Sequence, residues 1–182
     1  MEYADGGALK NYLKVNFDKH SWNDKYKFAF QLASAVSCLH EEGIVHRDLH
    51  SGNVLIHQGM IKLADFGFSK RIDVATSQSK VFGIIPYIDP KRFGELKGCD
   101  NTLQEDLSTV KSDVYSVGVL LWELSSGRPP FNFENYDIKL AIKISQGFRE
   151  SIIPGTPEDF INIYTECWDD EPDKRPAMNK EK

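Results

Sequence analysis

The run from Ser112 to Leu124 constrains the fold most strongly, because it is apolar on nearly every side. Its apolar members are Val114, Tyr115, Val117, Val119, Leu120, Leu121, Trp122 and Leu124. A helix of this kind is buried on most sides, at the centre of a domain. No uninterrupted apolar stretch is long enough to span a membrane. We therefore predict a central helix that begins at Ser112 and ends at Gly127 and the prolines that follow.

The other segments predict a mostly α domain with a small β-hairpin. Ser21 is a candidate N-cap with Asp24 three residues later, and it precedes a long helix. The apolar stripe of that helix is Trp22, Tyr26, Ala29, Ala33, Val36 and Leu39. Shorter helices are expected at residues 8–15, 136–146 and 157–168. Two β-type pieces, 53–57 and 60–64, flank Gln58-Gly59 and predict a tight turn.

Composition excludes several classes of function. The 182 residues suffice for one domain, and the net charge of −5 provides no basic surface for nucleic acid or an anionic membrane. Cys38, Cys99 and Cys167 lack paired spacing and are expected to be reduced thiols. Residues 1–5 have neither the basic region nor the apolar core of a signal peptide, so a cytoplasmic location is expected.

The candidate chemistry lies in two short motifs, His46-Arg47-Asp48-Leu49-His50-Ser51-Gly52-Asn53 and Asp65-Phe66-Gly67. Phosphoryl transfer needs a carboxylate at the attacking hydroxyl and oxygen ligands that hold magnesium against the nucleotide phosphates. Asp48 suits the first role, and Asn53 and Asp65 suit the second. The hairpin between them would bring Asn53 and Asp65 together. Each motif alone is a weak signal, but their order and spacing make a chance match improbable.

These residues resemble the catalytic and magnesium loops of the protein kinase superfamily. Three further stretches extend the resemblance: the buried helix that carries Asp113, the ending Cys167-Trp168…Pro172…Arg175-Pro176, and the opening Met1-Glu2-Tyr3-Ala4-Asp5-Gly6-Gly7. The whole chain, 1–182, is similar to a partial kinase domain, most of all to the tyrosine-kinase-like group, whose members mostly modify serine and threonine. The resemblance implies a kinase C-terminal lobe, an α+β helical bundle whose small hairpin carries both loops.

The resemblance implies ATP and Mg²⁺ as cofactors and a protein as substrate. The matching catalytic positions are Asp48, Arg47 and Asn53, and magnesium would lie on Asn53 and Asp65. The adenine would meet the backbone of Glu2 and Ala4 and the side chain of Leu55. Structural or regulatory roles would fall to His46, Phe66, Asp113 and Arg175.

The resemblance also divides the chain into functional segments. The hinge would be 1–8, the catalytic loop with its following strand 44–57, and the activation segment 65–91. Arg47 would pair with a phosphate on that segment, for which Thr76, Ser77 and Ser79 are candidate acceptors. For any one of these three residues, a solvated loop position is the simpler interpretation.

Two features depart from the family pattern. On this resemblance the chain would begin at the hinge, so the N-terminal β lobe with its Gly-rich loop, strand lysine and helix glutamate would be absent, and ATP binding by this chain alone is expected to be weak. The missing lobe or a partner chain would be required. The family motif A-P-E reads Asp89-Pro90-Lys91, which would set Lys91 against Arg175 as a like-charge pair. Asp89 or Glu95 is the candidate substitute.

Two other functions stay open. A non-catalytic, pseudokinase-like interaction module would suit the missing lobe and Lys91, although Asp48, Asn53 and Asp65 are retained. A small-molecule phosphotransferase of the aminoglycoside or choline kinase type would also have a loop of the form H-x-D-L-H-x-G-N. Those enzymes lack the Asp65-Phe66-Gly67 triplet, the buried helix with its aspartate and the C-W…R-P ending, so this alternative is remote.

Overall fold

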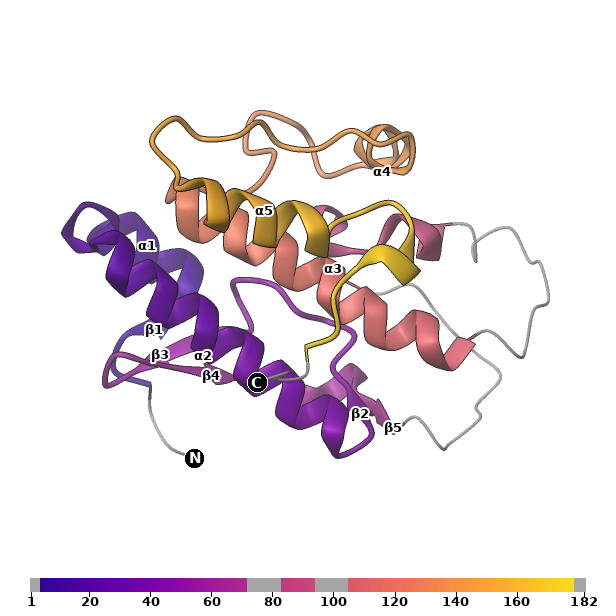
Figure 1. The fold of residues 1–182 in the computed structure, drawn as a ribbon, viewed down its shortest axis with the longest axis horizontal. Coiled ribbons are helices and arrows are strands. Elements are labelled where there is room, and N and C mark those ends of the chain that lie inside the picture. Colours follow the sequence, from indigo (N-terminus) through magenta and orange to yellow (C-terminus); the bar gives the residue numbers. More distant parts are fainter. Residues whose placement is uncertain (1–3, 72–82, 94–104, 179–182) are drawn as a thin grey trace.

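The computed structural model describes residues 4–71, 83–93 and 105–178, with the backbone alone for 105–109. Five α-helices lie in these residues: α1 (Leu9–Asn16), α2 (Trp22–Glu41), α3 (Glu105–Ser126), α4 (Ile138–Ser145) and α5 (Glu158–Cys167). The strands are β1 (Gly7–Ala8), β2 (Ile44–Val45), β3 (Val54–His57), β4 (Met60–Leu63) and β5 (Lys70–Arg71). The predicted mostly α class with small β elements is confirmed (Figure 1).

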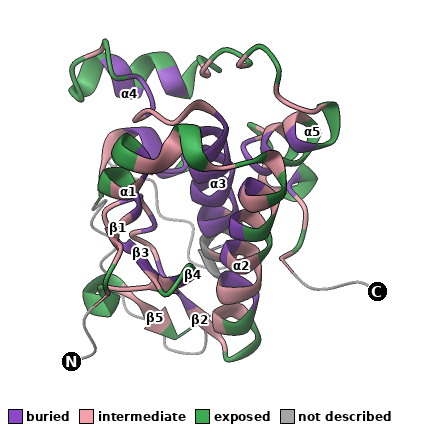
Figure 2. Ribbon diagram, turned by 90° about the vertical axis from the view of Figure 1, so that its left-hand side faces the viewer, coloured by how far each residue is buried: buried purple, intermediate pink, exposed green. Residues whose placement is uncertain are grey.

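Helix α3 forms the centre of the domain and packs against both α2 and α5 (Figure 1). Every side chain from Ser112 to Ser125 is buried, as the purple colouring in Figure 2 shows. The predicted central helix is therefore confirmed, but its predicted start is wrong, because α3 begins at Glu105. Ser112 does not cap the helix; its hydroxyl donates to Asp89 instead. Leu107 and Val110 precede Val114 at helical intervals of three and four, so the sequence contained a signal for this first part of the helix that the prediction did not use.

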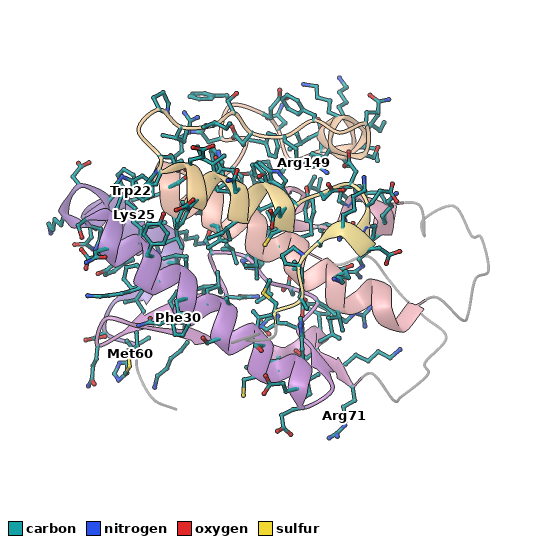
Figure 3. The ribbon with its side chains drawn as sticks, viewed as in Figure 1. Trp22, Lys25, Phe30, Met60, Arg71 and Arg149 are labelled. Atoms are coloured by element: carbon teal, nitrogen blue, oxygen red, sulfur yellow. The ribbon has the colours of Figure 1, made fainter. Side chains whose placement is uncertain are left out.

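Helix α2 begins as predicted, with a capping box in which the side chains of Ser21 and Asp24 each accept the other residue's backbone N–H. Its most deeply buried residues are Lys25, Phe28, Leu32, Val36 and Ser37. Of the predicted stripe, Val36 belongs to this set, and Trp22, Tyr26 and Ala29 are partly buried against the core, so the packed face is confirmed for these four residues. The stripe omitted Phe28 and Leu32, which are buried on the same helix. Lys25 is buried because its ammonium lies over the rings of Phe17 and Trp22, at 3.7 and 4.6 Å from their centroids (Figure 3).

The predicted hairpin is confirmed as β3 and β4, which pair antiparallel with Val54 opposite Leu63 and His57 opposite Met60. Two further pairings were not predicted. Strand β1 joins the other edge of β3, and β2 pairs with β5 in a separate sheet. Strands of two residues are too short to show an alternating pattern, so only the folded chain reveals them.

The remaining predicted helices occur as α1, α4 and α5, with ends within two residues of the expected positions. Gly127 follows α3 with a φ of 71°, and an added Cβ there would overlap the ring of Phe17. Glycine is therefore required at this helix end by both conformation and space. The proline-containing stretch forms short 3₁₀ turns at Ile85–Tyr87 and Pro90–Phe93, in line with the expectation that it is not a regular helix.

Candidate active site

Asp113 of α3 holds the catalytic-loop backbone from the core, where only 1% of the residue is exposed. Its Oδ2 accepts the backbone N–H of His46 at 2.8 Å, and its Oδ1 accepts that of Arg47 at 2.9 Å. The Nε2 of His40 lies 3.0 Å from Oδ2. Arg47 has a φ of 69°, which costs a non-glycine residue on the order of 1–3 kcal/mol. These hydrogen bonds stabilise a strained turn just before Asp48.

Asp48, the predicted catalytic base, has one carboxylate oxygen anchored. The Nδ2 of Asn53 donates to Asp48 Oδ2 at 3.1 Å and to the main-chain oxygen of Asp48 at 3.0 Å. Asp48 Oδ1 faces Gly83, where a Cβ would lie 3.1 Å from this oxygen. Gly83 has a φ of 126°, which also favours glycine. The carboxylate is thus oriented, with Oδ1 directed toward the activation segment.

His50 lies beside Asp48, and sequence reasoning assigned it no role. Its Nδ1 accepts the backbone N–H of Gly52 at 3.0 Å, so the neutral ring carries its hydrogen on Nε2. That Nε2 lies 3.7 Å from Asp48 Oδ2. Burial lowers the pKa of His50, while the charge of Asp48 acts in the opposite direction. A Cβ at Gly52 would stand 2.8 Å from Cε1 of His50, so the imidazole needs glycine beside it.

The hairpin brings Asn53 and Asp65 to neighbouring positions at one end of β3 and β4. The backbone N–H of Ala64 donates to Asn53 O at 2.9 Å, and Asp65 is the next residue. Asp65 has a φ of 61°, in the left-handed region, and its Oδ1 accepts the N–H of Gly67 at 3.3 Å. This second strained residue ends the strand and turns the carboxylate to the exposed surface.

The oxygen atoms of Asn53 and Asp65 suit a magnesium ion whose remaining ligands come from a nucleotide and from water. Asn53 uses both amide hydrogens on Asp48, which leaves its Oδ1 for a cation, and the exposed Asp65 supplies a carboxylate. Magnesium prefers oxygen ligands and takes several of them from phosphates and water. Within residues 4–71, 83–93 and 105–178, no group of three or more His, Cys, Asp or Glu could hold a metal by itself.

The rings of His46 and Phe66 are in contact, with centroids 5.1 Å apart. His46 is fully buried, and its Nε2 lies 3.1 Å from the main-chain oxygen of Ala64. Phe66 is 48% exposed. The Ser69 hydroxyl donates to His46 O at 3.3 Å, so the start of the activation segment is joined to the catalytic loop.

The predicted adenine-contact segment lies along β3. Strand β1 places Ala8 opposite Leu55, and the half-buried Ala4 accepts the N–H of Gly7 at 3.0 Å. Glu2 lies outside the described residues. Asp5, which sequence reasoning did not select, accepts the backbone N–H of Gln58 at 2.8 Å and so joins this segment to the hairpin turn.

A buried network, also missed from the sequence, connects the catalytic loop with the activation segment. The Tyr87 hydroxyl donates to Glu123 Oε2 at 2.6 Å and lies 3.1 Å from the Ser51 hydroxyl. Glu123 is 1% exposed, and burial raises its pKa to about 7. Burial likewise raises the pKa of Tyr87 well above its ordinary value. A single glutamate within an apolar helix gives no sequence signal that its partner is a tyrosine on another segment.

The predicted like-charge contact between Lys91 and Arg175 is wrong. Arg175 instead donates to both carboxylate oxygens of Asp89, at 2.6 and 3.1 Å, and both side chains are almost completely buried. Asp89, one of the two candidate substitutes, therefore neutralises Arg175. Lys91 turns outward and pairs with Glu171 at 3.0 Å. Its long side chain reaches solvent, whereas the shorter Asp89 carboxylate is held inside by Ser112 as well.

The candidate phosphorylation positions Thr76, Ser77 and Ser79 lie outside the described residues, as does the alternative anchor Glu95. Both described cysteines, Cys38 and Cys167, are free thiols. Burial raises the pKa of Cys167 to about 12, so it is protonated at neutral pH. No helix in the described part of the chain is long and apolar enough to cross a membrane.

An oriented aspartate beside two oxygen donors that suit magnesium is the arrangement expected of a phosphotransferase. Comparison with known families agrees, since residues 1–181 match the protein tyrosine and serine/threonine kinase family. The chain belongs to this family.

Its relatives include proteins of diverse origin. The chain is 33% identical over 193 residues to a probable serine/threonine-protein kinase of Dictyostelium discoideum, with 97% of this chain and 8% of the relative covered. It is 33% identical over 181 residues to platelet-derived growth factor receptor alpha of Takifugu rubripes, covering 96% and 16%. It is 30% identical over 200 residues to the serine/threonine-protein kinase PrkC of Bacillus subtilis, covering 100% and 29%. The chain thus spans less than a third of the length of each of these relatives.

Proposed function

We propose that this chain supplies the catalytic and magnesium loops of an ATP-dependent protein kinase that phosphorylates serine or threonine. The observation that carries the proposal is the orientation of Asp48. Asn53 holds its Oδ2, and Oδ1 is directed toward the activation segment, where an acceptor hydroxyl could reach it. Asn53 and Asp65 lie beside this carboxylate on the neighbouring hairpin end.

In the proposed reaction, the acceptor hydroxyl oxygen forms a bond to the γ-phosphorus, and the bond from that phosphorus to the β,γ-bridging oxygen breaks. The hydroxyl proton moves to Asp48 Oδ1, and ADP leaves. Bound magnesium would neutralise the phosphate charge from Asn53 Oδ1 and Asp65. His50 and Asn53 keep Asp48 Oδ2 in place, so that the free oxygen is aligned before the substrate arrives.

The helix-rich fold with small antiparallel sheets supports assignment to the C-terminal lobe of a kinase. On the sequence motifs, we assign this kinase to the tyrosine-kinase-like group. In this assignment, 1–8 is the hinge, 44–57 the catalytic loop with its strand, and 65–91 the activation segment. A Gly-rich phosphate loop and a strand lysine are not found in residues 1–182, so we expect the chain alone to transfer phosphate slowly. An N-terminal lobe or a partner chain would complete the nucleotide site.

The pseudokinase-like alternative has lost one of its supports. Lys91 suggested a damaged activation segment, but Asp89 occupies the place of the ion-pair partner. The small-molecule phosphotransferase alternative is not supported by the match to the protein kinase family over residues 1–181.

The test measures phosphate transfer from radiolabelled ATP to peptides whose acceptor is serine, threonine or tyrosine. The assay uses the full-length native protein. Asp48→Asn should lower kcat by about 10²–10⁴-fold. Asp159→Asn removes an exposed carboxylate from α5 and should leave kcat unchanged. Equal rates for the native protein and Asp48→Asn would refute the role of Asp48, and exclusive tyrosine labelling would refute the assigned substrate class.

A further inference from the structure

Two exposed lysines of α1 lie beside the catalytic loop, and the proposed reaction does not use them. Lys10 and Lys14 are four residues apart, so both side chains lie on one face of the helix. Among the described residues, neither forms an ion pair. Lys27, Lys91 and Lys143 each lie against an acidic side chain, whereas the exposed Lys19 donates to the amide oxygen of Asn16.

Helix α1 is fixed directly to the catalytic loop. The backbone N–H of Lys10 donates to Ser51 O at 3.1 Å, and its Nζ would lie 3.8 Å from a Cβ at Gly52. Because the His50 ring leaves no room for that Cβ, the loop has no side chain at position 52 that could cover or neutralise the ammonium group. A positive charge therefore stands beside the loop that presents Asp48.

The carboxylate beneath these lysines cannot neutralise them by direct contact. Glu123 is 1% exposed, and its Oε2 accepts the Tyr87 hydroxyl at 2.6 Å. Burial raises the pKa of Glu123 to about 7, and the charges of Lys10 and Lys14 act against this rise. The lysines thus lie close enough to influence Glu123, but their ammonium groups remain available to a ligand at the surface.

We propose that Lys10 and Lys14 select protein substrates with an acidic residue close to the acceptor hydroxyl. This inference rests on the proposed kinase function. An extended peptide advances about 3.3 Å per residue, so a chain with its hydroxyl at Asp48 can place a carboxylate or phosphate over α1 within a few residues. Such a group gains favourable charge interaction with both lysines, whereas a basic residue there is repelled.

The experiment compares three serine peptides that differ only in acidic, neutral or basic residues flanking the acceptor. We would measure phosphate transfer to each peptide and, in a separate assay, peptide binding by fluorescence anisotropy. Both assays use the full-length native protein. The acidic peptide should bind about tenfold more tightly than the neutral one, since each exposed ion pair contributes up to about fivefold. The preference should weaken as salt is raised.

The variants assign this preference to α1. Lys10→Glu with Lys14→Glu should reverse it toward the basic peptide, and Lys10→Gln with Lys14→Gln should abolish it without reversal. Lys27→Glu with Lys139→Glu changes the net charge equally on α2 and α4 and should leave the preference as in the native protein. Thermal unfolding checks that each variant is folded, and the glutamine pair serves if the glutamate pair does not fold.

The outcomes separate this inference from the kinase assignment. Phosphate transfer without acidic preference, or the same preference in the native protein and in the glutamine pair, overturns the role of the lysines and leaves the kinase assignment intact. Acidic preference in anisotropy with no transfer to any peptide supports the lysines and overturns the kinase assignment.

Discussion

The predicted catalytic loop and the end of the predicted activation segment follow their family pattern to different degrees. Around Asp48, the motif residues occur at their expected positions. Asn53 bonds Asp48 from five positions away, and Asp113 adds two bonds to the loop from α3. At the other region, the family glutamate is replaced by Lys91, and Asp89 bonds a residue 86 positions away. A reacting group must occupy one place, whereas a buried cation needs only a carboxylate that can reach it. An ion-pair partner can therefore move along the chain when a catalytic residue cannot.

The largest expected effect tests the anchor. Asp89→Ala leaves the guanidinium of Arg175 buried without its carboxylate, and should lower the free energy of unfolding by about 3–5 kcal/mol. Urea unfolding followed by circular dichroism measures this. Asp170→Ala removes a mostly exposed carboxylate and is the matched control. A cost below that of the control would show that Asp89 is not the anchor, and the contrast with the catalytic loop would disappear.

The next effect tests the catalytic loop. Asp113→Asn keeps one acceptor oxygen but not two, so one of the N–H groups of His46 and Arg47 loses its partner. We expect a loss of about 2–3 kcal/mol in unfolding free energy, and faster hydrogen exchange confined to the loop. Hydrogen exchange by mass spectrometry distinguishes the two regions. Equal exchange at the loop and at the activation-segment end would contradict a local role for Asp113.

Glu123 tests whether the two regions are coupled, because the Tyr87 hydroxyl that donates to its carboxylate also lies beside the Ser51 hydroxyl. Burial raises its pKa from 4.5 to about 7, so the folded state binds the proton more tightly. Its contribution to stability is complete below pH about 4.5 and is lost as the pH rises toward about 7. The slope should reach about 1 kcal/mol per pH unit and disappear in Glu123→Gln. If the unfolding free energies of the native protein and of Glu123→Gln changed with pH in the same way across this range, the raised pKa of Glu123 would be contradicted.

The smallest expected effect concerns Lys91. Its side chain is 50% exposed and its partner Glu171 59%, so Lys91→Glu should change the unfolding free energy by at most about 1 kcal/mol. Melting temperatures of the two proteins measure this. A large rise on charge reversal would mean that Arg175 lacks a sufficient partner, and that Asp89 does not replace the family glutamate.

Much of the local architecture was predictable from the sequence. The apolar run of α3, the capping box of α2 and the hairpin turn each depend on residues within a few positions of one another. The proximity of Asn53 and Asp65 at one end of the hairpin was predictable for the same reason, since a tight turn determines which residues lie side by side. The family assignment also rested on such local motifs.

Only the tertiary structure decided which distant groups meet. The partner of Arg175, the three bonds to Asp113 and the Tyr87–Glu123 contact all join segments tens of residues apart. Burial makes an unpaired charge or polar group costly, so each must find a partner, but several partners are compatible with the same sequence pattern. The sequence therefore supplied the candidate residues for the chemistry, and the packing of α3 against its neighbours decided how they are held, because distance and burial exist only in the folded chain.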